Sequence, residues 1–174
     1  MLDLILSSIY FILPAYVANA CPVIAAKLNL PLKRPVSGKL FGSHKSIRGF
    51  YAGYLGALAM LALQLYFQKN NIMSSYILLD YEHINLFLYA FLFGIGAITG
   101  DLVKSFFKRR LNIAPGQPWF PFDQLDFVTG ALIFLLPFYI PAWQVIVTII
   151  VVTPVLHFLA NVTGYLLHLK KVWW

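Results

Sequence analysis

The sequence predicts an all-α, polytopic membrane protein with about five transmembrane helices, and three observations support this prediction. The 174 residues are 60% hydrophobic and only 11% charged, whereas about a quarter of the residues in soluble domains are charged. The mean hydropathy is +0.77. Apolar runs recur along the chain, and about 20 such residues cross a bilayer core of about 30 Å as a helix. We therefore expect residues 1–174 to form one transmembrane domain.

The first three predicted spans are simple apolar runs. They cover about residues 4–26, 50–67 and 84–105. The stretch "ANAC", which ends at Cys21, is similar to a signal-peptide cleavage site, but Asp3 lies where a basic region would be and apolar sequence continues beyond the cysteine. A retained first helix is expected. Cys21 is the single cysteine, which excludes an internal disulfide and a cysteine-rich metal site.

The last apolar stretch must contain a break. From residue 127 to residue 169 the chain is almost entirely apolar, and one helix of that length would be about twice the bilayer thickness. Pro137 and Pro141, with Trp143 as an interface anchor, indicate where the chain turns back. The fourth and fifth spans are therefore predicted at about 126–140 and 143–169. A re-entrant hairpin here would leave four crossings instead.

The charge distribution favours five crossings. With five, every lysine and arginine except Lys69 lies on one side of the membrane, whereas four would move Lys170 and Lys171 to the other side. The positive-inside rule then places the N-terminus outside and the C-terminus in the cytoplasm. The loops at about 27–49 and 106–125 become cytoplasmic. We expect a multi-pass protein of the cell membrane whose chemistry faces the cytoplasm.

A polar stripe follows the third span. Asp101 lies at the membrane boundary, and Lys104, Ser105 and Lys108 follow it at i+3, i+4 and i+7, which places all four on one face of a helix. An ionisable residue at the edge of a transmembrane helix is a functional candidate, because burial of an unpaired carboxylate is costly. The alternative interpretation is that Asp101, like Asp123 and Asp126 further along the chain, simply pairs with Lys104 or Lys108.

Two further carboxylates begin the fourth span. Asp123 and Asp126 are at i and i+3 in "PFDQLDF", so they share a face if a helix starts there. Together with Asp101 they are suited to magnesium and a polyphosphate, because Mg²⁺ prefers hard oxygen ligands and bridges phosphate oxygens. Zinc is disfavoured because the four histidines are scattered.

The first basic loop contains a candidate phosphate-binding segment, "GKLFGSHKSIRGF". Glycines allow backbone amides to approach phosphate closely, and a guanidinium group can bind two of its oxygens. The residues concerned are Gly42, Lys45, Ser46, Arg48 and Gly49. The P-loop spacing is absent, so we reject that interpretation.

Three polar residues lie deeper in the apolar runs. His157 and Asn161 are one helical turn apart in the last span, and Asn19 is a lone amide in the first. Such residues commonly connect helices through hydrogen bonds. Lining of a substrate pocket is the other interpretation for all three.

The two basic loops also carry a recognisable motif. The segment "GDLVKSFFKRRLNIAPGQPWFPFDQLDF" resembles the signature of membrane CTP-dependent phosphatidate cytidylyltransferases, which is a G-D-x-x-x-S-x-x-K-R stretch, then P-G, then a D-x-x-D pair. The matching positions are Gly100, Asp101, Ser105, Lys108, Arg109, Pro115, Gly116, Asp123 and Asp126. Gln124 replaces a usual arginine, and with "LPAYVANACPV", "FGSHKSIRGF" and "HFLANVTGYLL" the chain more closely resembles the archaeal branch, the CDP-archaeol synthases.

This resemblance implies a reaction and its participants. CTP and 2,3-bis-O-(geranylgeranyl)-sn-glycerol 1-phosphate would react to give a CDP-lipid and pyrophosphate, with Mg²⁺ as cofactor and membrane lipids, not nucleic acid, as surroundings. The expected metal ligands are Asp101, Asp123 and Asp126. The residues expected to neutralise or clamp phosphate are Lys45, Arg48, Lys104, Lys108 and Arg109. The oligomeric state is not predicted.

Two other functions are weighed against this one. The D-G-x-x-A-R motif of CDP-alcohol phosphotransferases does not occur in the chain. A small membrane transporter or a lipid-binding scaffold without catalysis would also use a basic face and intramembrane polar stripes.

Overall fold

The computed structural model describes residues 1–41, 45–114 and 117–166. The regular secondary structure of these residues is helical, apart from an isolated β-bridge between Pro35 and Ser46, and loops and turns connect the helices. The elements are α1 (Leu2–Lys27), α2 (Gly38–Phe41), α3 (Ile47–Lys69), the 3-10 turn η1 (Ser74–Tyr76), α4 (Leu86–Arg110), α5 (Phe122–Leu135) and α6 (Trp143–Leu166). Of the described helices, α1, α3, α4 and α6 are long and apolar enough to cross a membrane. The predicted all-α membrane fold is confirmed.

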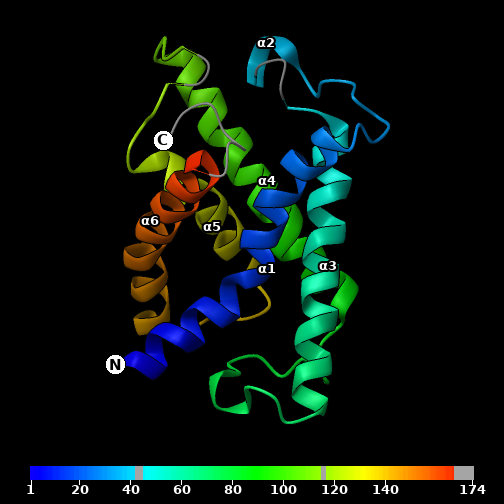
Figure 1. Cartoon of the computed structure of the whole chain (residues 1–174), viewed down its shortest axis with the longest axis vertical. Coiled ribbons are helices and arrows are strands. Elements are labelled where there is room, and N and C mark those ends of the chain that lie inside the picture. Colours follow the sequence, from blue (N-terminus) through cyan, green and yellow to red (C-terminus); the bar gives the residue numbers. More distant parts are fainter. Residues whose placement is uncertain (42–44, 115–116, 167–174) are drawn as a thin grey trace.

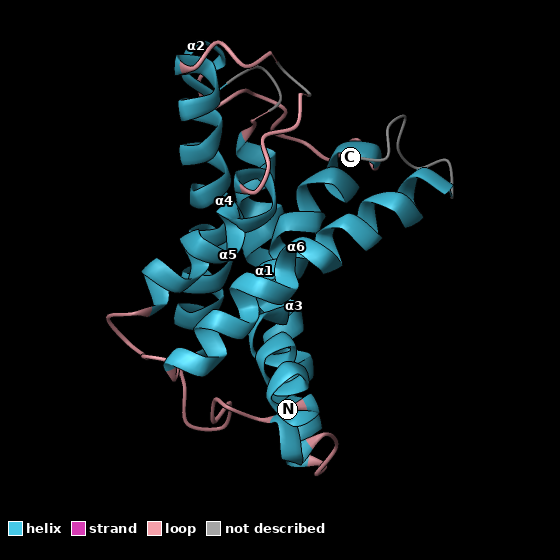
Figure 2. Cartoon of the chain, turned by 90° about the vertical axis from the view of Figure 1, so that its left-hand side faces the viewer, coloured by secondary structure: helices cyan, strands magenta, loops and turns pink. Residues whose placement is uncertain are grey.

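Helix α4 lies at the centre of the bundle. It packs against α1, α3 and α5, and α6 covers α1 and α5 on the other side (Figures 1 and 2). The short helix α2 and the C-terminal end of α4 lie at one end of the molecule, at the top of Figure 1, and the connection from α3 to α4 lies at the opposite end. The two basic segments of the sequence are therefore neighbours in space.

The helix boundaries differ from the predicted spans in two places. Helix α4 continues to Arg110, beyond the predicted span of 84–105, as the helical stripe predicted as far as Lys108 requires. Basic side chains in a last turn interact favourably with the helix dipole. Helix α5 ends at Leu135, ahead of Pro137, whose ring disfavours a helical conformation in the preceding residue. With 14 residues, α5 is about 21 Å long, which is shorter than a full crossing.

One intramembrane hydrogen bond compensates for a proline. Pro14 lies inside α1 and has no backbone N–H, so the carbonyl group of Tyr10 loses its donor four residues later. The side chain of Gln64, from α3, supplies the missing donor, since its Nε2 lies 2.6 Å from the Tyr10 carbonyl oxygen. Gln64 is fully buried. In a bilayer, a backbone group without a partner is costly, and this contact joins α3 to α1.

We therefore expect Gln64→Leu to destabilise the folded protein by about 1–3 kcal/mol, because the Tyr10 carbonyl is left buried without a donor. Thermal unfolding in detergent should show a lowered midpoint. Gln144→Leu is the matched control, since Gln144 is exposed on α6. An unchanged midpoint for Gln64→Leu would show that the hydrogen bond contributes nothing to stability.

Candidate active site

Two glycines bring α4 and α5 into backbone contact beside the acidic residues. A Cβ atom placed on Gly100 would lie 2.1 Å from the carbonyl oxygen of Asp126, and one on Gly130 would lie 2.3 Å from the carbonyl oxygen of Gly96. No real side chain fits at such distances. Small residues of this kind allow transmembrane helices to pack closely. Asp101, which follows Gly100, is thereby held close to the start of α5.

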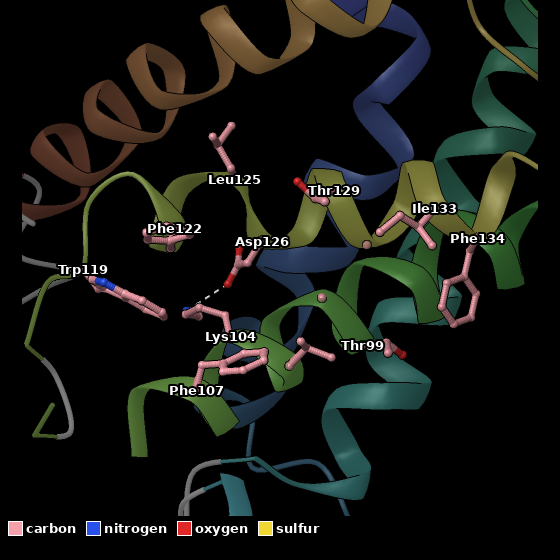
Figure 3. Close-up of a pocket in the computed structure, with 13 residues that line it drawn as sticks. Thr99, Lys104, Phe107, Trp119, Phe122, Leu125, Asp126, Thr129, Ile133 and Phe134 are labelled. Atoms are coloured by element: carbon pink, nitrogen blue, oxygen red, sulfur yellow. Dashed lines mark ion pairs between the residues drawn. The ribbon is translucent and has the colours of Figure 1, made fainter. Parts of the chain in front are cut away.

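Lys104 lies among three carboxylates. Its Nζ atom is 3.2 Å from Asp101 Oδ1, 3.0 Å from Asp123 Oδ1 and 2.9 Å from Asp126 Oδ2. Figure 3 shows the Lys104 and Asp126 side chains pointing toward each other across the gap between α4 and α5. Asp126 is the most enclosed of the three, with 5% of its side chain exposed. The three acidic residues singled out in the sequence therefore converge on one ammonium group.

Two further lysines complete the cluster. Lys45, from the segment before α3, donates a hydrogen bond to Asp101 Oδ2. Lys108 donates to both oxygens of Asp123, at 3.0 and 2.9 Å, and to the backbone carbonyl of Gln117 at 2.6 Å. The polar stripe thus faces inward, and Ser105, between the two lysines on α4, is also buried.

Asp123 also organises the chain that leads into α5. Its Oδ2 accepts a hydrogen bond of 2.6 Å from the backbone N–H of Trp119. Burial favours a raised pKa for Asp123, but the hydrogen bond from Lys108 and the charge of Lys104 outweigh burial and lower the pKa below its ordinary value. Asp123 is therefore a carboxylate at neutral pH, available as an acceptor.

The fit of these residues to a divalent cation can be judged from Lys104. In the described part of the chain, no three His, Cys, Asp or Glu side chains form a ready-made metal site. Three carboxylate oxygens nevertheless surround one cationic nitrogen at 2.9–3.2 Å. Carboxylate oxygens are the ligands that Mg²⁺ prefers. The donor set fits a divalent ion once the ammonium group moves aside.

The glycine-rich segment contributes Lys45 to the cluster, and its Arg48 makes a contact elsewhere. The Arg48 side chain donates to the backbone carbonyl of Leu30 at 3.2 Å. Ser46 is the N-cap residue of α3 and Gly49 lies in the first turn of that helix. Gly42 lies outside the described residues, as do Pro115 and Gly116 of the motif.

The remaining candidates have contacts of their own. Arg109 donates from Nη1 to the carbonyl of Ile113 at 2.7 Å, at the end of α4. His157 Nδ1 and Asn161 Nδ2 are 3.2 Å apart, and the His157 ring lies beside Phe127 of α5, with 6.5 Å between ring centroids. Asn19 is half-buried in the second half of α1.

An apolar cavity of about 510 Å³ begins at this cluster and extends between α4 and α5 (Figure 3). Lys104 and Asp126 line one part of it. Its other walls are mainly apolar and include Val103, Phe107, Trp119, Phe122, Ile133 and Phe134. A charged cluster and a space suited to hydrocarbon are therefore contiguous.

The sequence interpretation did not include these cavity residues. Aromatic and aliphatic side chains on lipid-facing helices look alike whether they face a cavity or the bilayer, so composition carries no signal. The close contact of α4 and α5 does have a sequence signal, since Gly96 and Gly100 are spaced as in the small-xxx-small pattern of packed transmembrane helices.

Comparison with known proteins shows which family this chain belongs to. A family model described as CDP-archaeol synthase, CarS-like, matches residues 1–174. The chain belongs to the CDP-archaeol synthase family. The resemblance indicated by the motif is thereby confirmed. A curated member from Methanococcus maripaludis (strain C7) is 37% identical over 100% of this chain and 99% of its own. One from Pyrococcus furiosus is 36% identical over 98% of this chain and 98% of its own.

A third curated relative and a solved structure agree with the family. The CDP-archaeol synthase of Thermofilum pendens is 37% identical over 96% of this chain and 80% of its own length. A solved structure, described as that of an intramembrane enzyme for archaeal membrane lipids biosynthesis, superposes with a TM-score of 0.70. It shares 32% sequence identity and covers 88% of this chain and 91% of that one. This relative is an intramembrane protein, in agreement with the apolar helices of this chain.

Proposed function

We propose that this protein transfers the cytidylyl group of CTP to an unsaturated isoprenoid ether-lipid phosphate, giving CDP-archaeol and pyrophosphate. One observation carries the proposal: three carboxylates surround a single cation position at the mouth of an apolar cavity. A nucleotide triphosphate with its metal suits the first feature and a lipid suits the second. Membership of the CDP-archaeol synthase family supports these two substrates.

The reaction requires positioning more than covalent catalysis. A phosphate oxygen of the lipid attacks the α-phosphorus of CTP, a new P–O bond forms, and the bond to the β-phosphate breaks to release pyrophosphate. The phosphate monoester is an adequate nucleophile near neutral pH, so no general base is assigned. Catalysis then depends on aligned reactants and on neutralisation of developing charge.

Asp101, Asp123 and Asp126 would hold Mg²⁺. When bound, this ion would neutralise part of the negative charge of the triphosphate. Lys45, Lys104 and Lys108 already lie within hydrogen-bonding distance of the same carboxylates, and we assign them to the phosphates of the substrates. Arg109 and Ser105 would lie at the edge of this phosphate site. The other proposed substrate-binding residues are Ser46, Gly42, Gly49, Asn19, His157 and Asn161.

Kinetics of two variants can distinguish between two roles for Arg48, phosphate binding and loop anchoring. If it binds phosphate, Arg48→Ala should raise the KM of one phosphate-bearing substrate by at least about tenfold, since charged hydrogen bonds contribute about 1.5–3 kcal/mol. If it only anchors the loop through Leu30, Tyr51→Phe should have the same effect, because Tyr51 donates to the neighbouring carbonyl of Pro31. Steady-state kinetics of both variants with both substrates separate the roles.

The cavity is proposed to receive one prenyl chain beside the lipid phosphate. We expect Ile133→Trp, which fills the cavity wall, to raise the KM for the lipid phosphate by about tenfold while the KM for CTP stays unchanged, because apolar contact area is lost to the substrate. Ile140→Trp is the matched control, since Ile140 is 76% exposed and lies outside the cavity. Equal kinetics for the two variants would place the lipid elsewhere.

The basic end of the bundle is proposed to face the cytoplasm, in the cell membrane. Lys45, Lys104 and Lys108 lie there, and basic residues accumulate on the cytoplasmic side of membrane proteins. Purified protein with labelled CTP, lipid phosphate and Mg²⁺ should release pyrophosphate only when the lipid is present. Lipid binding or flux without pyrophosphate release would instead support a scaffold or a transporter.

A further inference from the structure

Lys104 occupies the point on which the proposed metal ligands converge. Its ammonium nitrogen is 2.9–3.2 Å from one oxygen of each of three aspartates. A Mg²⁺ ion needs its oxygen ligands at about 2.0–2.1 Å, so the ion and the ammonium group cannot share this space. A metal ion can enter only if the side chain of Lys104 moves away.

The charges of the cluster oppose the entry of a metal ion by itself. Asp101, Asp123 and Asp126 contribute three negative charges, and their ion-pair partners Lys45, Lys104 and Lys108 contribute three positive charges, so the formal sum is zero. A divalent ion added to this partly buried and balanced cluster would leave an excess of positive charge that is costly to desolvate. A triphosphate that arrives with the ion more than offsets this excess of positive charge.

The structure also offers Lys104 a destination. Besides its three carboxylate contacts, Lys104 lines the cavity between α4 and α5 together with Asp126, so its side chain borders open space. Phosphate oxygens placed at the edge of that space, beside Lys104, would accept the hydrogen bonds that the carboxylates accept now, in charge-assisted contacts of comparable strength. The move exchanges one set of anionic partners for another.

We propose that Lys104 is a tethered cation that holds the metal position until nucleotide binds, so that the divalent ion and CTP load together. This inference rests on the proposed function, because it takes the three aspartates as metal ligands. Lys104 is then a residue that controls the order of binding and, after it has moved, a phosphate ligand.

The test measures Mn²⁺ binding, by the electron paramagnetic resonance signal of free Mn²⁺, to purified protein without nucleotide. We expect Lys104→Met to bind Mn²⁺ about tenfold more tightly than the unmodified protein, a size typical of coupling between two ligands. Arg110→Gln is the matched control: it removes one positive charge from the same helix, where Arg110 is exposed and stacked on Phe106. Its Mn²⁺ affinity should stay that of the unmodified protein.

A second arm needs no variant. The unmodified protein is measured without lipid, so that no turnover occurs. CTP should raise the affinity for Mn²⁺, and saturating Mn²⁺ should raise the affinity for CTP by the same factor. This factor should be smaller in Lys104→Met. Equal Mn²⁺ affinity with and without CTP in the unmodified protein would overturn the proposal. So would a Lys104→Met variant whose affinity without nucleotide is unchanged or weaker.

Asp126→Asn distinguishes the two levels of inference. If this variant loses Mn²⁺ binding while Lys104→Met behaves like the unmodified protein, only the inference about Lys104 fails. If Asp126→Asn binds Mn²⁺ and CTP normally, the metal-ligand assignment in the proposed function fails, and the Lys104 inference fails with it.

Discussion

Asp126→Asn is expected to lower the rate of CDP-lipid formation by about two to three orders of magnitude, the loss usual when a group that stabilises transition-state charge is removed. Asp126 is the most buried carboxylate of the cluster and accepts from Lys104 at 2.9 Å. Asparagine keeps the shape of the side chain but presents one neutral oxygen to the metal ion. The change therefore removes charge without creating a cavity.

The measurement is transfer of labelled CMP from CTP to lipid phosphate by purified protein in detergent with excess Mg²⁺. Asp3→Asn makes the same chemical change at an exposed residue in the first turn of α1 and should leave the rate unchanged. Asp123→Asn should lose comparable activity and also loosen the contact with Trp119. Turnover near normal in Asp126→Asn, in folded protein, would remove this residue from the metal site.

The second large effect concerns a glycine. Gly100→Ala should reduce stability by at least about 1–3 kcal/mol and activity by about a hundredfold, since the added methyl group would lie 2.1 Å from the carbonyl oxygen of Asp126. Helices α4 and α5 must separate to accept it. Asp101 would then shift relative to Asp126, and a displacement of about 1 Å can cost about a hundredfold in rate.

Gly49→Ala is the control for the stability measurement. Gly49 is also a helical glycine, but the nearest side-chain atom to an added Cβ is Pro22 Cβ at 3.6 Å, an ordinary contact. Alanine favours the helix over glycine by about 1 kcal/mol, so this variant should unfold at the same temperature as the unmodified protein or higher. If Gly100→Ala unfolds like Gly49→Ala, the close helix contact does not position the site.

Much of the fold follows from sequence because a bilayer imposes one strong rule, that an apolar run of sufficient length forms a helix. This rule locates the helices but not every boundary. The continuation of α4 to Arg110 is indicated by the helical spacing of Asp101, Lys104 and Lys108 and not by apolar length, and its basic side chains interact with the helix dipole and with the aspartates of α5. Apolar length alone does not report such contacts.

Some features of the candidate site could likewise be predicted from the sequence, and others could not. Helical spacing alone predicts that Asp101, Lys104 and Lys108 share one face of a helix, and the folded chain brings Asp123 and Asp126 to that face. The contact of Lys45 with Asp101 could not be predicted, because it joins distant segments of the chain through a loop without periodicity. The central position of Lys104 depends on the packing of two helices, which one sequence does not specify.

The hydrogen bond from Gln64 to Tyr10 has a consequence for biosynthesis. N-terminal segments are synthesised first, so α1 is made before α3, with the carbonyl group opposite Pro14 still without its partner. That group acquires its donor only when α3 arrives beside it. The polar side chain in α3 thus makes the first helix dependent on a later one. The earliest stable intermediate of assembly should be the α1–α3 pair, on which α4 with its proposed site residues then docks.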